Sequence, residues 1–149
     1  MRIRTHVVFV NAAKVVRYSR DEKLRQVMGR AALLLADGVP VVWASKLGRK
    51  PLAERVAGID LMERMIPVSA ARGYKVYLLG ATGEVIQKTV HVLRNRFATL
   101  QIVGYRDGYF TPGDKPGIIA DINASGADLL LLGWALLTRS FGRTSTCPS

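Results

Sequence analysis

The sequence has one cysteine, few aromatic residues and no long apolar run. A single cysteine, Cys147, cannot form an internal disulfide framework or a cysteine-based metal cluster. The longest apolar candidate, Ala127–Leu137, carries Asp128 and is shorter than the roughly 20 residues that a membrane-spanning helix needs. Near the first residue, Asn11 and Lys14 interrupt the only run that could serve as a secretory signal. These absences predict a cytoplasmic protein.

Acidic residues are also scarce, since 11 Asp and Glu stand against 22 Lys and Arg and give a net charge of +11. Such an excess favours an anionic partner: nucleic acid, an acidic membrane surface or a phosphorylated substrate. The basic residues form no dense block, and aromatic residues, at 7%, offer no evident platform for stacking bases. We therefore expect no nucleic-acid partner. Nucleic-acid binding is kept as an alternative hypothesis, and strongly salt-dependent binding to duplex would support it.

The 149 residues contain short apolar runs that alternate with amphipathic segments. Continuous apolar runs are typical of parallel strands covered on both faces, and alternation of strands with helices predicts right-handed crossovers. The expected fold class is therefore α/β, a Rossmann-like mostly parallel sheet with helices on both faces. The predicted strands are His6–Val10, Leu33–Ala36, Lys75–Leu79, Leu100–Val103 and Ala127–Leu132.

The segments between these strands carry helix signals. Ser19 and Glu22 have the spacing of a capping box, Pro67 predicts a kink, and Gly73 predicts a helix end. The predicted helices run from Arg20 to the early thirties and over Pro40–Leu47, Asp60–Arg72, Glu84–Phe97 and Lys115–Ala124. With no repeat and no linker, we expect one domain over residues 1–138, and a disordered tail over residues 139–149.

Ligands of open α/β sheets bind beyond the carboxyl ends of the strands, which selects the residues that follow each predicted strand. Asp37 follows an apolar run and precedes Gly38 and a helix. Its carboxylate can act as a general base while Gly38 lets a substrate approach. The same Asp-Gly pair can simply make the turn and cap the next helix, and spacing alone favours that interpretation.

A glycine turn, Gly80-Ala-Thr-Gly83, lies between a strand and a helix, where backbone N–H groups can cradle a phosphate. An ordinary strand–helix turn explains it equally well. The turn departs from the dinucleotide fingerprint, because Ile86 occupies the position of the third glycine and no acidic residue follows at the expected distance. We therefore expect no nicotinamide cofactor.

Other polar residues follow the strands or flank the turns. Arg55 can grip a diphosphate through its planar guanidinium, and Asp60 can bond a hydroxyl or favour the first turn of its helix. The loop Asp107-Gly-Tyr-Phe110 offers an acceptor beside two aromatic rings, or only covers the sheet edge. His6 and His91 have no partner at metal-ligand spacing, so we expect no metal.

Several of these pieces together resemble the WecG/TagA/CpsF family of bacterial glycosyltransferases, over roughly Val7 to Gly133. Each motif is weak alone, and the combination is specific. In chain order the motifs are Asn11-Ala-Ala-Lys-Val, Ala36-Asp-Gly-Val39, Arg55-Val-Ala-Gly-Ile-Asp-Leu61, Tyr77-Leu-Leu-Gly80 and Val103-Gly-Tyr-Arg-Asp-Gly-Tyr-Phe110.

The resemblance implies an inverting hexosyltransferase without a cofactor. It would move a sugar, N-acetylmannosamine or a related hexose, from a UDP-sugar to a polyprenyl-diphosphate-linked acceptor during teichoic acid, exopolysaccharide or related cell-envelope synthesis. Asp37 would deprotonate the acceptor hydroxyl, and Asn11 would contact the donor sugar or shape its pocket. The other residues that the resemblance implicates are Gly38, Arg55, Gly58 and Asp60 along the cleft, and Gly80, Thr82, Asp107, Gly108 and Tyr109 along the nucleotide-sugar pocket.

Two departures from the family pattern stand out. Phe9 occupies a position where the family commonly has Thr, and after Asp128–Leu132 the expected Gly-x-Pro-Lys-Gln-Glu stretch is replaced by an unmatched sequence from Gly133 onward. We therefore expect a domain that is incomplete at its C-terminal end, with weak or absent transferase activity and self-association into a homo-oligomer through an exposed sheet edge.

Because the implied acceptor is a membrane lipid, the resemblance also implies peripheral contact with the inner face of the plasma membrane. The basic C-terminal membrane segment of the family is not seen in this sequence. The alternative function is a non-catalytic nucleotide- or anion-binding remnant of the family, which replacement of Asp37 by Asn would distinguish from an enzyme.

Overall fold

The computed structural model describes residues 5–37, 41–43 and 58–133. The chain divides into two compact units, Met1–Leu61 and Met62–Ser149. Gly38, Arg55, most of the helix predicted from Pro40 and the tail predicted from residue 139 lie outside the described residues. Residues 41–43 of that predicted helix are helical.

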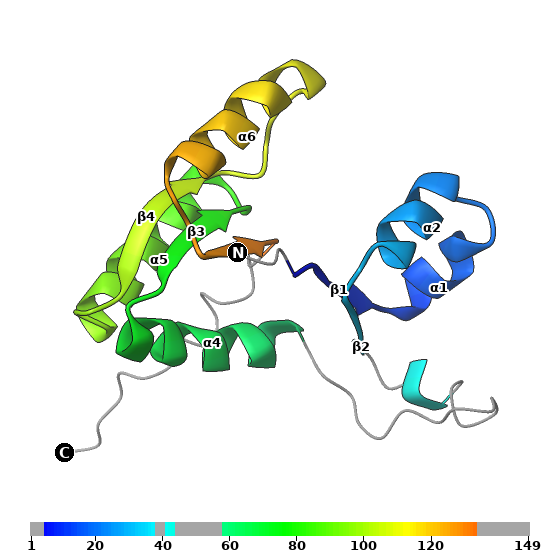
Figure 1. The fold of residues 1–149 in the computed structure, drawn as a ribbon, viewed down its shortest axis with the longest axis horizontal. Coiled ribbons are helices and arrows are strands. Elements are labelled where there is room, and N and C mark those ends of the chain that lie inside the picture. Colours follow the sequence, from blue (N-terminus) through cyan, green and yellow to red (C-terminus); the bar gives the residue numbers. More distant parts are fainter. Residues whose placement is uncertain (1–4, 38–40, 44–57, 134–149) are drawn as a thin grey trace. The chain divides into compact units, whose positions relative to one another are not determined.

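The first unit contains two parallel strands joined by two short helices (Figure 1). Strands β1 (Val7–Val10) and β2 (Leu33–Ala36) pair in register from Val7 opposite Leu33 to Val10 opposite Ala36. Both strands were predicted, and β1 is one residue shorter than expected. The connection consists of α1 (Ala12–Tyr18) and α2 (Glu22–Gly29).

The predicted capping box at Ser19 is wrong. Ser19 is the C-cap of α1, and its hydroxyl donates to the Val16 carbonyl at 3.2 Å. The N-cap of α2 is Asp21, whose carboxylate accepts the Leu24 N–H at 3.0 Å. That hydrogen bond, together with the neighbouring Arg17 guanidinium, lowers the pKa of Asp21, so the cap stays charged at neutral pH. Ser19 cannot cap α2 because it already ends α1, so the N-cap of α2 falls on Asp21.

The second unit contains three parallel strands, with β3 between β4 and β5 (Figure 1). The strands are β3 (Lys75–Leu79), β4 (Gln101–Arg106) and β5 (Leu129–Leu132). Helix α5 (Gly83–Arg96) connects β3 to β4, and α6 (Lys115–Ala124) connects β4 to β5 on the other side of β3. Right-handed crossovers in these opposite directions put α5 and α6 on opposite faces of the sheet.

Burial in the second unit agrees with a sheet that is covered on both faces. Consecutive residues Val76, Tyr77 and Leu78 of the central strand are all buried, although their side chains alternate between the faces. Helix α5 buries Ile86 and Leu93. The predicted α/β class, Rossmann-like with parallel strands, is confirmed, and the described strands form one sheet of two strands and one of three.

Several element boundaries differ by a few residues from the predictions. Helix α4 (Gly58–Arg72) begins two residues early and continues through Pro67. It ends at Arg72, just before Gly73, whose φ of 67° is left-handed as a glycine stop requires. Strand β4 extends to Arg106, so the loop that follows it is shorter than expected. A 3-10 turn, η1 (Pro112–Asp114), leads from this loop into α6.

Glycine at position 104 is required by a close approach within the sheet. The pairing of β3 with β4 shifts by one residue between Val76 and Tyr77, and the Tyr77 ring lies over Gly104. A Cβ atom at position 104 would stand 2.4 Å from Cε2 of that ring. The ring is itself buried, so it has little room to move away.

We therefore expect Gly104→Ala to lower the free energy of unfolding by about 1–3 kcal/mol, the usual cost of overpacking. Urea denaturation followed by circular dichroism measures this change. Gly117→Ala, in α6 where a Cβ meets no atom within 4 Å, is the matched control and should leave stability unchanged or raise it. Equal effects of the two substitutions would contradict the packing of Tyr77 on Gly104.

Candidate functional site

Asn11 and Asp37 lie together at the carboxyl ends of two neighbouring parallel strands. Asn11 follows β1, and Asp37 follows β2. The backbone N–H of Asp37 donates to the Val10 carbonyl at 2.8 Å, which extends the pairing of the strands by one residue. Asp37 is half-buried and Asn11 is exposed. The first unit thus places an acid and an amide where ligands of α/β sheets bind.

Asn11 has a structural task that leaves part of its side chain available. Its Oδ1 caps α1 by accepting the Lys14 N–H at 3.0 Å. The Lys14 ammonium in turn donates to the Phe9 carbonyl at 2.7 Å and so stands beside the end of β1. Since the cap uses only the oxygen of Asn11, its NH₂ group can donate to a ligand. Lys14 was not among the predicted site residues, and its only signal in the sequence is its position three residues after the capping Asn11.

Gly58 lies against the ring of Phe9. A Cβ atom at position 58 would stand 3.3–3.4 Å from atoms of the Phe9 ring. The motif glycine and the aromatic residue that replaces the usual threonine therefore pack against each other. Asp60, two residues further along α4, lies in its first turn and is exposed. A carboxylate there stabilises the helix and can still reach a ligand.

In the second unit, backbone hydrogen bonds join the segments that follow β3 and β4. The Gly80 N–H donates to the Arg106 carbonyl at 3.0 Å, and the Gly108 N–H donates to the Ala81 carbonyl at 2.9 Å. A Cβ atom at position 108 would stand 3.2 Å from the Cα of Gly80. The glycine at position 108 thus allows two backbones to touch at the carboxyl ends of adjacent strands.

The remaining predicted residues of this unit shape the same two loops. The Thr82 hydroxyl caps α5 by accepting the Val85 N–H at 3.3 Å. Oδ1 of Asp107 accepts the Tyr109 N–H at 2.9 Å, in a turn that holds the loop beyond β4. Tyr109 itself is 78% exposed, so its aromatic ring is open to a ligand.

The far end of the β4 loop is anchored at Asp114. Its carboxylate accepts hydrogen bonds from the hydroxyl and the N–H of Thr111, at 2.7 and 2.8 Å. These bonds, and secondarily the charge of Arg106, lower the pKa of Asp114. Because the pKa is lowered in the folded chain, these hydrogen bonds stabilise the loop fully above the usual pKa range of Asp. Their contribution to stability is lost only as acid protonates Asp114.

The described residues contain no group of three or more His, Cys, Asp or Glu arranged to hold a metal ion. In the same part of the chain, no helix is long and apolar enough to cross a membrane.

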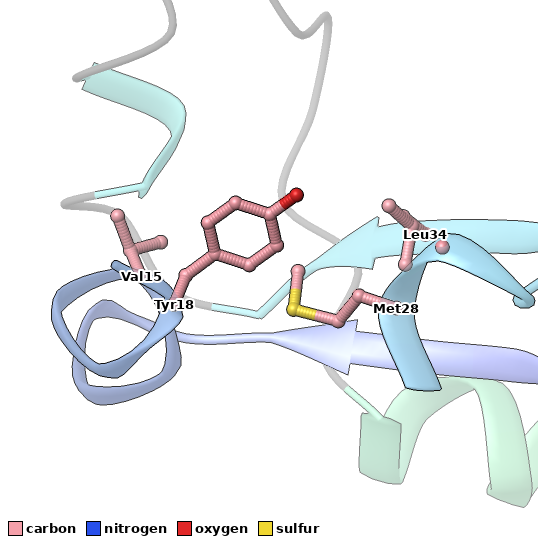
Figure 2. Close-up of a pocket in the computed structure, with 5 residues that line it drawn as sticks. Val15, Tyr18, Met28 and Leu34 are labelled. Atoms are coloured by element: carbon pink, nitrogen blue, oxygen red, sulfur yellow. The ribbon is translucent and has the colours of Figure 1, made fainter. Parts of the chain in front are cut away.

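The first unit also contains an open apolar groove that the sequence analysis missed. Its volume is about 340 Å³, and α1, α2 and β2 supply its walls (Figure 2). None of the predicted site residues lines it, and it was missed because α1 was not predicted. The lining residues are Val15, Tyr18, Met28, Gly29 and Leu34.

Parallel strands with glycine turns and polar residues at their carboxyl ends define a Rossmann-like α/β protein. A model of the Glycosyl transferase WecG/TagA/CpsF family matches residues 1–136 of the 149. The chain therefore belongs to this family of glycosyltransferases. Membership indicates a transferase of cell-surface polysaccharide synthesis that acts on a sugar donor and an acceptor.

Proposed function

We propose that the chain transfers a hexose, of the N-acetylmannosamine type or related to it, from a UDP-sugar to a polyprenyl-diphosphate-linked sugar at the inner face of the plasma membrane. The transfer inverts the anomeric centre, and Asp37 is its base. The observation that carries the proposal is the half-buried Asp37 beside Asn11 at the carboxyl ends of β1 and β2, in a chain of a glycosyltransferase family.

The reaction needs one base and no covalent intermediate. The Asp37 carboxylate takes the proton of the acceptor hydroxyl, whose oxygen attacks the anomeric carbon from the face opposite UDP. The bond from that carbon to the diphosphate oxygen breaks, and UDP leaves with the electron pair. Asn11 donates from its NH₂ group to the donor sugar, Gly38 lets the acceptor approach Asp37, and Asp60 bonds a sugar hydroxyl.

Positive groups and N–H donors must stabilise the departing diphosphate. We assign this task to the N-terminus of α5, which Thr82 caps. The Glu84 carboxylate in the first turn of α5 would repel an anion bound there. The Lys88 ammonium forms an ion pair with this carboxylate and lowers the pKa of Glu84. That pairing reduces the repulsion that a diphosphate meets at this helix end.

The uracil base stacks on the exposed Tyr109 ring, which the hydrogen bond from the Tyr109 N–H to Asp107 holds in place. We expect Tyr109→Ala to weaken UDP binding by about 1–3 kcal/mol, the usual value of one base–aromatic stack, and Tyr109→Phe to preserve binding. Calorimetric titration with UDP measures both. Tyr74→Ala, at another exposed tyrosine, is the control. Unchanged affinity of Tyr109→Ala would place the base elsewhere.

A transfer assay tests the whole proposal. Radiolabelled UDP-hexoses are incubated with the protein and a polyprenyl-diphosphate-linked sugar, and the product is separated and its anomeric configuration determined. The proposal requires an inverted product that depends on the acceptor. Tight UDP-sugar binding without any transfer would instead support the non-catalytic nucleotide-binding module.

A further inference from the structure

Helix α1 turns its apolar side chains outward. Helix α1 has no buried residue, and its two valines, Val15 and Val16, are 49% and 68% exposed. Lys14, by contrast, is only half-exposed, because its ammonium bonds to the end of β1. A helix that packs on its own sheet shows the reverse pattern, with valines inside and lysine outside. This exposed face therefore suits a partner that accepts apolar side chains.

The exposed face continues into the apolar groove of Figure 2. Val15 and Tyr18, one helical turn apart on α1, face Met28 of α2 and Leu34 of β2 across it. Tyr18 and Leu34 are each close to half exposed. Parallel strands are normally covered on both faces, so an open Leu34 is unusual for this architecture. The groove and the outward side of α1 together form one surface, here called the hairpin surface, defined by Val15, Val16, Tyr18, Met28 and Leu34.

The two helices that carry the hairpin surface are rich in basic residues. Residues 12–30 contain Lys14, Arg17, Arg20, Lys23, Arg25 and Arg30 against only Asp21 and Glu22. Both acids are neutralised locally, since Arg17 pairs with Asp21 and Arg25 with Glu22. Within the described residues, Arg20 and Lys23 have no carboxylate partner. The hairpin thus presents uncompensated positive charge beside exposed apolar side chains.

We propose that the hairpin surface docks on an anionic lipid membrane. Apolar side chains that enter the boundary between headgroups and acyl chains, flanked by Lys and Arg that meet negative headgroups, are the usual composition of an interfacial membrane surface. Tyrosine suits this boundary because its ring is apolar and its hydroxyl is polar. A nucleic acid would use the basic residues but would leave the valines and leucine in water. The proposal does not depend on transferase activity.

Vesicle sedimentation tests the proposal with the full chain. We expect binding to vesicles of phosphatidylglycerol mixed with phosphatidylcholine, much weaker binding to pure phosphatidylcholine, and a decrease with added salt. Val15→Glu, which removes an apolar anchor and adds a negative charge, should reduce the partition coefficient by about tenfold or more. Replacing Arg20 and Lys23 together by Gln should reduce binding to the anionic vesicles alone.

Two matched controls separate this surface from a general effect of composition. Ile119→Glu changes an apolar residue on α6 that is 59% exposed against 49% for Val15, and Arg94→Gln changes an exposed arginine on α5. Both variants should bind vesicles as the wild type does. Equal losses in test and control variants would overturn the proposal, as would equal binding to neutral and anionic vesicles.

The unfolding midpoint of Val15→Glu distinguishes a membrane-docking surface from one that another part of the chain covers. If Val15→Glu lowered the unfolding midpoint and left vesicle binding unchanged, the exposed valines would serve folding, and the proposal would be wrong. Binding to duplex DNA without binding to vesicles would equally overturn it, in favour of a nucleic-acid surface.

Discussion

Asp37→Asn should lower the rate of sugar transfer by about 10²–10⁴-fold, the typical contribution of a general base. The amide has the shape of the carboxylate but cannot accept the proton of the acceptor hydroxyl. The backbone N–H of residue 37 still donates to the Val10 carbonyl, so the end of β2 keeps its place. Affinity for the UDP-sugar should therefore stay close to that of the wild type. Initial rates with a labelled donor and calorimetric titration measure the two quantities separately.

Asp128→Asn is the matched control for this substitution. Asp128 lies just before β5, at the amino ends of the strands, where its carboxylate accepts the Lys75 N–H at 3.0 Å. An asparagine oxygen can accept the same hydrogen bond, so this variant should keep its activity. Full activity of Asp37→Asn would assign the base to another residue. Loss of binding and stability together would show that Asp37 only makes the turn after β2.

Gly108→Val should lower affinity for UDP-sugars by about tenfold or more, because overpacking costs about 1–3 kcal/mol and here falls on two binding loops. A side chain at position 108 starts 3.2 Å from the Cα of Gly80 and 3.5 Å from the Ala81 nitrogen, and neither backbone atom can move like a flexible side chain. The loops must separate, which breaks the hydrogen bond from the Gly108 N–H to Ala81 and displaces Tyr109. Calorimetry with UDP-sugars measures the loss.

Gly113→Ala is the control for the second prediction, since the atom nearest to a Cβ there is the Thr111 hydroxyl oxygen at 3.7 Å, an ordinary contact. This variant lies in the same loop and should bind UDP-sugars normally. Wild-type affinity of a folded Gly108→Val protein would mean that the paired loops do not form the nucleotide pocket.

The strands were predictable because their signals are local. The run Val76–Leu79 is continuously apolar and is followed directly by Gly80, and both features are visible in sequence. Helix α1 was missed because it has no inward apolar stripe, which is the main helix signal in sequence. The only trace of α1 was the capping Asn11. The order of the strands in each sheet depends on contacts between distant segments, which local patterns do not contain.

In the candidate site, too, some features were predictable from the sequence and others were not. Asp37 and the glycine turn were found because ligands bind at strand ends and because the family motifs contain these residues. The sequence could not show what lies against two of the motif glycines. Gly58 accommodates the Phe9 ring, and Gly108 lets its loop approach the backbone of Gly80. These contacts join residues far apart in the chain, and only a folded structure supplies them.

Calorimetric titration of the purified, folded chain with UDP-sugars, UDP and UMP tests the central claim most directly. We expect saturable binding of UDP-sugars that is tighter than binding of UMP, because the second phosphate and the sugar add contacts that UMP lacks. No binding of any UDP-sugar to a folded sample would contradict the assignment of a donor site to this chain.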